Sequence, residues 1–114
     1  MGKDLSISVL MDFYSELLTE KQRDTMDLYY NQDYSLAEIA QHLDISRQGV
    51  RDFIKRGEKQ LNEFEEKLGM VQKYNSVITS IEQIEELLNT DGIEELSAKR
   101  AKIIQKLKSI KEIL

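Results

Sequence analysis

Residues 36–54 read LAEIAQHLDISRQGVRDFI, a pattern typical of two short helices joined by a tight turn. Ala40 is small at the point where the second helix should cross the first, and Ser46 is a favourable N-cap for that second helix. Apolar residues before, within and after the turn are suited to set the angle between the helices: Ile39, Leu43, Ile45, Val50 and Phe53. This stretch predicts a helix-turn-helix.

The second helix of this pattern presents polar and basic residues on its other face. In helix-turn-helix proteins that bind DNA, its N-terminal turn enters the major groove, where Arg bridges guanine and Gln pairs with adenine. Residues 46–60 hold five Lys/Arg against two Asp/Glu, although the whole chain has a net charge of −5 and a pI near 4.9. We expect the nucleic-acid contacts to come from these residues: Ser46, Arg47, Gln48, Arg51, Asp52, Lys55, Arg56 and Lys59.

The same face also suits a protein-docking surface, and the sequence leaves both interpretations open. The acidic whole weakens the attraction to phosphates that summed cations would otherwise provide. Gly49 lies inside the second helix, where glycine costs about 1 kcal/mol relative to alanine, although it would permit close approach of a partner. Asp52 is a poor neighbour for a phosphate. We therefore expect modest-affinity binding of DNA or RNA, or the docking of a protein.

Helical signals also precede the helix-turn-helix. Helical spacing of five apolar residues predicts a first amphipathic helix that ends near Leu18: Val9, Leu10, Phe13, Tyr14 and Leu17. Thr19 and Gln22 form a predicted capping box, in which each side chain satisfies a backbone N–H of the other residue. This box opens a second helix over about residues 20–31.

The helix-turn-helix has start and stop signals of its own. Ser35 and Glu38 form a further predicted capping box, which opens the first of its two helices. Gly69 favours the left-handed conformation that ends many helices, so we expect the second helix to end near Leu68. These signals bound a helix-turn-helix domain over residues 1–69.

Two further helices are expected in residues 70–114. Apolar residues step by three and four along the first of them: Tyr74, Val77, Ile81, Ile84 and Leu88. The Asn-Thr-Asp-Gly sequence at 89–92 is a strong stop signal, and the stepping then resumes at Ile93, Leu96, Ile103, Leu107, Ile110 and Leu114. We expect an antiparallel helical hairpin. Because two short helices bury little more than one shared stripe, this extension should pack on the first domain or form a homodimer.

The composition of the 114 residues indicates the class of protein. Proline and cysteine are absent and 32% of the residues are charged, which favours an all-α fold and excludes disulfides. No stretch approaches the roughly 18 uncharged apolar residues of a membrane span, and the N-terminus has no apolar signal-peptide core. We expect a cytoplasmic protein without a membrane span.

Residues with catalytic chemistry form no recognisable site in the sequence. His42 is the only histidine, so it lacks the second imidazole or cysteine that a metal site or a triad would need. Adjacent glutamates such as Glu85 and Glu86 suit solvated helix faces. We expect no catalytic residue, no metal ligand, no cofactor and no enzymatic activity. Four tyrosines suit a helical core better than a base-stacking platform: Tyr14, Tyr29, Tyr30 and Tyr34.

The sequence resembles region four of bacterial sigma factors in several segments, which are LTEKQR at 18–23, YY at 29–30, YSLAEIA at 34–40 and ISRQGV at 45–50. More specifically, the tyrosines, the Ser-Arg-Gln turn and the Ile-Lys-Arg at 54–56 resemble the YlxM family of bacterial helix-turn-helix proteins. The resemblance covers roughly residues 9–70. It implies a sigma region-four-like bundle ahead of the hairpin.

The resemblance to the YlxM family also implies a function. Genes of that family lie beside those for the GTPase of the signal recognition particle and its receptor, which implies a regulatory or accessory factor of that pathway. The implied partners are the RNA and the GTPase of the particle. Carried over by position, sigma-type base contacts fall on Arg47, Gln48, Arg51 and Asp52. The alternative is a protein–protein adaptor that docks a protein such as this GTPase without binding nucleic acid.

Overall fold

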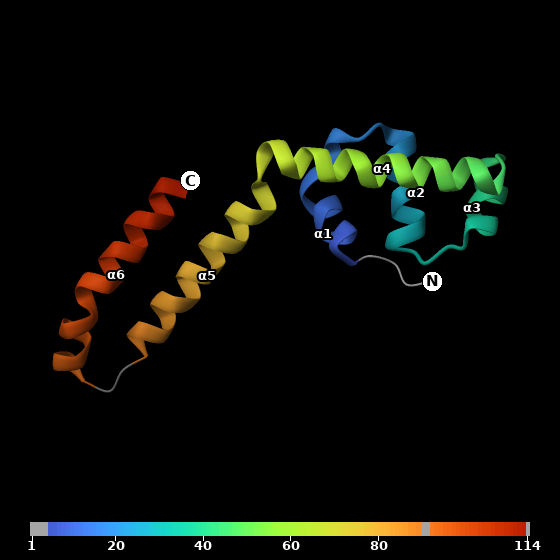
Figure 1. The fold of residues 1–114 in the computed structure, drawn as a ribbon. Coiled ribbons are helices and arrows are strands. Elements are labelled where there is room, and N and C mark those ends of the chain that lie inside the picture. Colours follow the sequence, from blue (N-terminus) through green and yellow to red (C-terminus); the bar gives the residue numbers. More distant parts are fainter. Residues whose placement is uncertain (1–4, 90–91, 114) are drawn as a thin grey trace. The chain divides into compact units, whose positions relative to one another are not determined.

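The computed structural model describes residues 5–89 and 92–113, and they form helices joined by short connections. The elements are α1 (Leu5–Tyr14), the 3-10 turn η1 (Ser15–Leu17), α2 (Glu20–Tyr30), α3 (Leu36–Leu43), α4 (Arg47–Leu68), α5 (Met70–Leu88) and α6 (Ile93–Ile113) (Figure 1). No strand occurs in these described ranges, and the predicted all-α fold is confirmed. The chain forms two compact units that divide between Gly69 and Met70.

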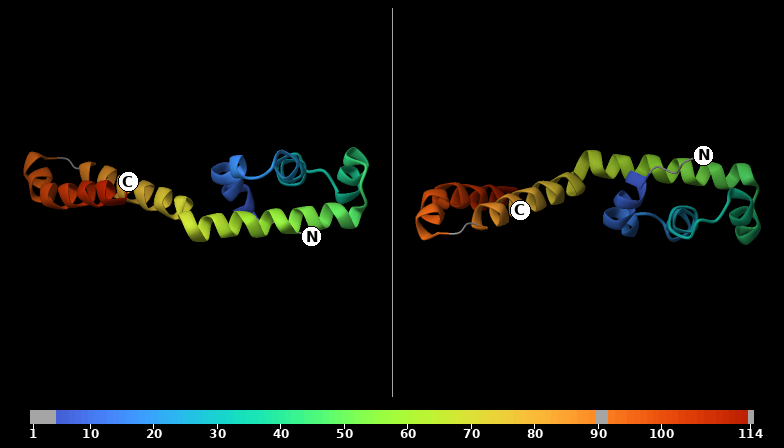
Figure 2. Two further views of the ribbon diagram at one scale, coloured as in Figure 1. Left: turned by 90° about the horizontal axis from the view of Figure 1, so that it is seen from above. Right: turned by 90° about the horizontal axis from the view of Figure 1, so that it is seen from below.

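In the first unit, α1, α2 and α3 lie on one side of the long helix α4, as the views in Figures 1 and 2 agree. With 22 residues, α4 is about 33 Å long and contacts all three of the other helices. The largest fully buried side chains come from each of the four helices: Tyr14, Met26, Ile39, Val50 and Leu61. The inner face of α4 therefore organises the core, and its outer face is left to solvent.

The buried face of α1 differs from the predicted one. Ile7, Leu10, Met11 and Tyr14 are buried, so two of the five predicted apolar residues are correctly placed. Val9 and Leu17 are 44% and 55% exposed, so their assignment to the apolar face was wrong. The α-helix ends at Tyr14 and continues as a tighter 3-10 turn, which changes the angular spacing and turns Leu17 outward.

The predicted capping box at the start of α2 is half correct. The Thr19 side chain accepts a hydrogen bond from the Gln22 backbone N–H at 3.2 Å, as expected for an N-cap. The Gln22 side chain does not return to Thr19, so that part of the prediction was wrong. Its buried amide instead donates to the carbonyl oxygen of Phe53 in α4, which ties α2 to α4.

Gly57 explains how Gln22 reaches the backbone of α4. A Cβ atom at Gly57 would lie 2.5 Å from Gln22 Nε2 and 2.7 Å from Met26 Sδ, well inside contact distance. The absence of a side chain at this position lets α2 and α4 approach closely enough for the buried hydrogen bond. Gly57 therefore determines how these two helices pack.

The first helix of the helix-turn-helix, α3, is capped at both of its ends. Ser35 Oγ accepts from the Glu38 backbone N–H at 3.0 Å, and the Ser35 backbone N–H donates to Glu38 Oε1 at 3.1 Å. This confirms the predicted capping box of α3. At the other end, Asp44 adopts a left-handed φ of 55°, and its N–H and that of Ile45 donate to the Ala40 carbonyl oxygen.

We expect the capping box of α3 to make stability depend on pH in one direction. The hydrogen bonds from the backbone and the side chain of Ser35 lower the pKa of Glu38 below its ordinary value of 4.5. A carboxyl group with a lowered folded-state pKa stabilises the fold above its ordinary value, and this stabilisation is lost as the pH falls through the lowered value. Urea unfolding of wild type and Glu38→Gln should differ most near neutral pH, and the difference should shrink below pH 4.5. A difference that does not change with pH would contradict this role.

The second unit consists of the antiparallel pair α5 and α6 (Figure 1), as predicted. Ile84 is buried in the seam, and Val77, Ile103 and Ile110 are half-buried there. Other apolar residues of the predicted stripes are exposed in the single chain, and their expected packing on the first domain or on a second copy stays a prediction: Tyr74, Ile81, Leu88, Ile93, Leu96 and Leu107. Two residues of the predicted stop signal, together with Leu114, lie outside the described residues.

Candidate nucleic-acid interface

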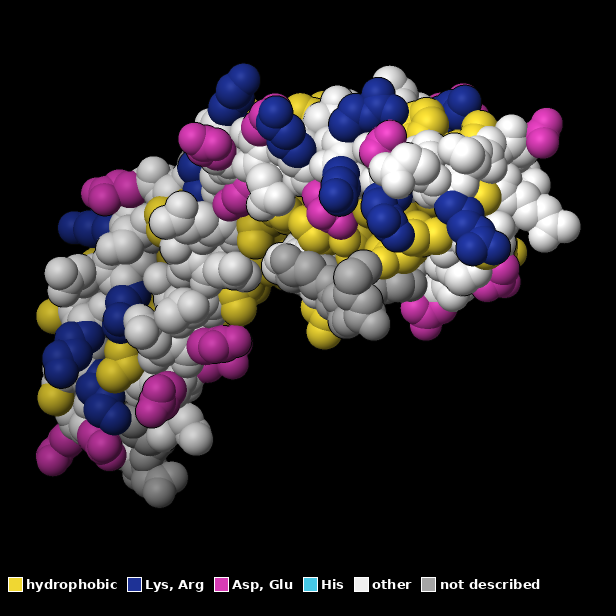
Figure 3. Space-filling view, turned by 45° about the vertical axis from the view of Figure 1, so that its right-hand side comes forward, with side chains coloured by type: hydrophobic (Ala, Val, Ile, Leu, Met, Phe, Trp, Pro, Cys, Tyr) yellow, Lys and Arg dark blue, Asp and Glu magenta, His cyan; other side chains and the backbone are white. Residues whose placement is uncertain are grey.

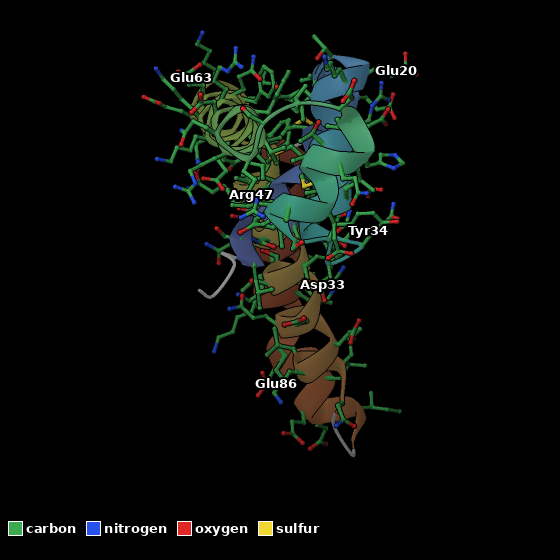
Figure 4. All side chains as sticks on the ribbon, turned by 90° about the vertical axis from the view of Figure 1, so that its right-hand side faces the viewer. Glu20, Asp33, Tyr34, Arg47, Glu63 and Glu86 are labelled. Carbon is green, nitrogen blue, oxygen red and sulfur yellow. The ribbon has the colours of Figure 1, made fainter. Side chains whose placement is uncertain are left out.

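The eight predicted contact residues lie at the N-terminal cap and in the first four turns of α4, and all are exposed. Figure 4 looks at the α3 end of the first unit, with Arg47 near the viewer and side chains radiating from α4. Because α1, α2 and α3 cover the inner face of α4, these residues are on the only face of this helix that a ligand can reach within the first unit. They divide into two groups by what they contact.

The first group consists of four cations, Arg47, Arg51, Lys55 and Lys59, which recur every four residues and which we call the basic row. Side chains four residues apart are neighbours on a helix surface, so the row follows one side of α4. None of the four is in an ion pair within the described part of the chain. Figure 3 shows Lys and Arg side chains along the first unit, with carboxylates between them.

A row of like charges has an energetic cost for the free protein. Each pair of like charges four residues apart destabilises a helix by about 0.2–0.5 kcal/mol, and the basic row contains such pairs along its whole length. The repulsion would be relieved by an anion lying along the helix. The basic row thus has the geometry of a binding surface for a chain of phosphates.

The second group interacts within the protein. Gln48 Nε2 donates to Asp52 Oδ1 at 3.0 Å. Arg56 Nε donates to the Asp52 carbonyl oxygen at 3.4 Å, and its guanidinium lies 5.0 Å from the centre of the Phe53 ring. The Ser46 side chain accepts from the Gly49 backbone N–H at 3.0 Å, which confirms it as the N-cap. The bond to Asp52 uses one N–H of the Gln48 amide, so a base can still pair with the second N–H and the amide oxygen, with the side chain oriented by Asp52.

Gly49 is explained by packing at the turn. A Cβ atom there would lie 3.2 Å from Ser46 Oγ and 3.6 Å from Ile45 Cδ1. The position therefore faces the capped turn that precedes α4. The structure gives Gly49 a local role beside its own N-cap, and a close approach to a partner is not needed to account for it.

A groove that sequence reasoning missed lies beside the basic row. It has a volume of about 350 Å³ and joins three helices, with Arg51 and Lys55 among the residues that line it. The others are Tyr29, Leu36, Ile54 and Glu58. The helical spacing of apolar residues in the sequence places Tyr29 and Leu36 on apolar faces. That spacing does not indicate that the space between α2, α3 and α4 is left partly open.

Of the four tyrosines expected in the helical core, Tyr14 is buried, whereas Tyr29, Tyr30 and Tyr34 are half-buried and Tyr29 lines the groove. Tyr14 is fully buried and donates to Glu65 at 2.5 Å, and its ring centre lies 5.9 Å from that of Phe64. The half-buried Tyr30 donates to Glu58 Oε1. His42 is exposed on α3. Within residues 5–89 and 92–113, no three His, Cys, Asp or Glu residues are grouped to hold a metal ion.

None of the described helices combines the length and the apolar character that a membrane crossing requires. The all-helical first unit, the capped turn at Asp44–Ser46 and the exposed face of α4 define a helix-turn-helix protein.

Residues 1–110 match the UPF0122 model of YlxM / p13-like helix-turn-helix proteins. The UPF0122 protein of Acetivibrio thermocellus is 45% identical over 115 residues, which cover 100% of this chain and 98% of that protein. The UPF0122 protein of Clostridium kluyveri is 44% identical over 110 residues, which cover 96% and 95%. The chain belongs to the UPF0122 family. The resemblance noticed in the helix-turn-helix is confirmed and extends through most of the hairpin.

Proposed function

We propose that this chain binds nucleic acid with α4 and serves as a regulatory or accessory protein, linked to the signal recognition particle pathway. The observation that carries the proposal is the basic row, whose four cations are exposed on a protein of net charge −5. On an otherwise acidic protein, this local reversal of charge draws a polyanion to one place. The family's helix-turn-helix character supports the same reading.

The basic row suits phosphates, and the first turn of α4 suits base edges. Arg51, Lys55 and Lys59 would follow a phosphate backbone, while Arg47 and Gln48 stand at the helix end that enters a groove. Asp52 repels phosphate and accepts a hydrogen bond from the Gln48 amide at 3.0 Å. The repulsion lowers the affinity of α4 for nucleic acid of any sequence. We therefore infer modest, salt-sensitive binding to DNA or RNA, with the RNA of the signal recognition particle as a candidate ligand.

The proposed role is one of binding in the cytoplasm, with no enzymatic step and no cofactor. The exposed face of α4 offers cations and an amide, which recognise phosphates and bases but do not supply a nucleophile paired with a base.

The groove beside the basic row favours a second candidate function, that of a protein–protein adaptor. Its lining combines the apolar Leu36 and Ile54 with the cations Arg51 and Lys55. Such a surface suits an apolar side chain next to a carboxylate on a partner protein. In this alternative the partner is the GTPase of the particle. The groove residues would then dock that protein, and α4 would not bind nucleic acid.

A side-by-side binding test separates the two functions. Anisotropy titrations would use the RNA of the particle, a duplex DNA and the GTPase, each at low and at physiological salt. We expect nucleic acid to bind at low salt and Arg47→Ala/Arg51→Ala to weaken it by about tenfold or more, since each lost phosphate or base contact costs about 1 kcal/mol or more.

The matched control is Lys67→Ala/Lys102→Ala, which removes two exposed cations elsewhere and so the same net charge. We expect the control variant to bind as wild type does. Nucleic-acid binding that is absent at low salt, together with binding of the GTPase that depends on Arg51, would overturn the first function and support the adaptor.

A further inference from the structure

The hairpin carries apolar side chains on its surface as well as in its seam. On α5, Tyr74, Ile81 and Leu88 are 53%, 39% and 52% exposed. A spacing of seven residues returns a side chain to nearly the same side of a helix, so the three form one row. Apolar residues of α6 are exposed as well: Ile93, Leu96, Ile104 and Leu107. We call these residues of α5 and α6 the outer face of the hairpin.

The exposed residues of α5 and α6 lie on the same side of the hairpin. Leu88 of α5 lines a hollow of about 330 Å³ whose other lining residues belong to α6. Among them are Ile93, Leu96 and Ile104 of the outer face, with Arg100 beside them. Figure 3 shows apolar side chains exposed among charged ones on this unit. A continuous apolar surface of this kind marks an interaction site.

The two helices of the hairpin carry opposite net charges. α5 has one lysine and three glutamates, whereas α6 has six Lys or Arg residues and three glutamates. If two hairpins met with α5 on α5 and α6 on α6, like charges would be brought together. If α5 of each lies on α6 of the other, unlike charges meet in both places. The outer face is therefore complementary to itself in one arrangement, in which the twofold axis runs parallel to the helices.

We propose that the outer face of the hairpin binds the same face of a second copy of the chain, with α5 of each copy on α6 of the other. The product is a homodimer held by a four-helix bundle. This proposal goes beyond nucleic-acid binding, because it assigns a partner and an orientation to the hairpin through residues that α4 does not share. A dimer would also carry two basic rows, which raises the affinity for a ligand that reaches both.

The size of the outer face is sufficient for a dimer. With 19 residues, α5 is about 28 Å long, and two helices packed side by side are about 20 Å wide. Two such faces cover in projection about 1,100 Å² in total, which is just above the roughly 1,000 Å² expected of a specific interface. Burial of the outer face would also remove its apolar side chains from water.

One charged pair tests the orientation. Arg100 lies seven residues after the start of α6, and Ile81 lies seven residues before the end of α5, so the two positions are level in the hairpin. With α5 on α6 of the second copy, Arg100 is level with Ile81 and one turn from Glu85 of that copy. Arg100 and Glu85 are both exposed in the single chain. The proposed dimer contains this pair twice, because Arg100 of each copy lies near Glu85 of the other.

Sedimentation equilibrium on the full chain tests the dimer. We expect a mass of twice 13.3 kDa at micromolar concentration for wild type and a single chain for Ile81→Asp. The matched control is Thr79→Asp, which places the same charge on an exposed position on the opposite side of α5 and should leave the dimer intact. A monomeric wild type, or equal dissociation by both variants, would overturn the proposal. Circular dichroism checks that the helices of each variant persist.

A charge exchange tests the orientation without touching the seam. Arg100→Glu and Glu85→Arg should each weaken dimerisation by about tenfold, because each places like charges at the interface, and the double variant should restore it. Single variants without effect, or a double variant no better than the worse single one, would overturn the α5-on-α6 arrangement. None of these residues belongs to the basic row. A monomeric variant that still binds nucleic acid would therefore separate the dimer proposal from the proposed function.

Discussion

Replacement of Gly57 by leucine is expected to lower the free energy of unfolding by about 3 kcal/mol, at the upper end of the cost of overpacking a core. The position of a Cβ at Gly57 is already 2.5 Å from Gln22 Nε2 and 2.7 Å from Met26 Sδ. A leucine would force α2 away from α4, break the hydrogen bond from Gln22 to Phe53 and leave a buried amide without its acceptor. Urea unfolding followed by circular dichroism measures the effect.

Gly49→Ala is the matched control for Gly57, because both glycines lie in α4 and gain helix propensity when a Cβ is added. At Gly49 the added atom would lie 3.2 Å from Ser46 Oγ, a contact that a shift of a few tenths of an ångström relieves without loss of the N-cap hydrogen bond. We expect this variant to be within about 0.5 kcal/mol of wild type or slightly more stable. Equal losses for Gly49→Ala and Gly57→Leu would contradict the packing role of Gly57.

The helix-turn-helix could be predicted from the sequence because its signals are local. The Ser35–Glu38 capping box, the Ser46 N-cap and the end of α4 at Gly69 all depend on residues within a few positions of one another. Such signals act through hydrogen bonds that a helix end must satisfy whatever lies around it. They were correct within a residue or two.

The contacts between helices could not be predicted in the same way. The Gln22 side chain matches the capping-box pattern, in which its oxygen would accept from the Thr19 backbone N–H. Its NH2 group instead donates to the Phe53 carbonyl oxygen, because Gln22 is buried against α4. Leu17 matches an apolar face that the short 3-10 turn rotates out of register, and Val9 lies on the side of α1 away from its buried residues. These outcomes depend on distant residues and on how α1 and α2 sit on α4, which periodicity does not report.

The residues of the candidate site could be predicted from the sequence, but their hydrogen bonds and contacts could not. Arg51 and Lys55 were expected on the outer face of α4 and are exposed there. Whether a polar side chain on that face faces outward or bonds to a neighbour depends on rotamers, as the Gln48–Asp52 bond and the position of Arg56 over Phe53 show. In the hairpin, apolar residues that step by three and four fall on two neighbouring stripes of one helix. The sequence does not show that the stripe with Ile84 is buried against α6 while the stripe with Ile81 is exposed.

Neutralisation of the whole basic row is expected to lower nucleic-acid affinity by about a hundredfold at low salt, because three phosphate contacts and the base contact of Arg47 would be lost together. The variant changes Arg47, Arg51, Lys55 and Lys59 to glutamine. Glutamine keeps the helix propensity of these positions, and removal of the like-charge pairs should leave the protein at least as stable as wild type. A loss of binding in a variant that unfolds no more readily than wild type would therefore be a loss of contacts and not of the fold.

The control for this variant removes four exposed cations outside the row: Lys67, Lys73, Lys102 and Lys108, each changed to glutamine. It has the same net charge as the row variant, so it reproduces any general increase in repulsion. We expect its affinity to remain close to that of wild type, because Lys67 lies eight residues beyond Lys59, the last residue of the basic row, and the other three lysines belong to the second unit.

The dependence of nucleic-acid binding on salt tests the central claim most directly. Each neutralised phosphate contributes about −0.7 to −0.9 to the slope of the logarithm of affinity against the logarithm of salt concentration. The three phosphate contacts proposed for Arg51, Lys55 and Lys59 predict a slope of about −2 to −3 for wild type and for the control, and a slope near zero for the row variant. A flat dependence in wild type, or an unchanged slope after neutralisation of the row, would contradict a nucleic-acid interface on α4.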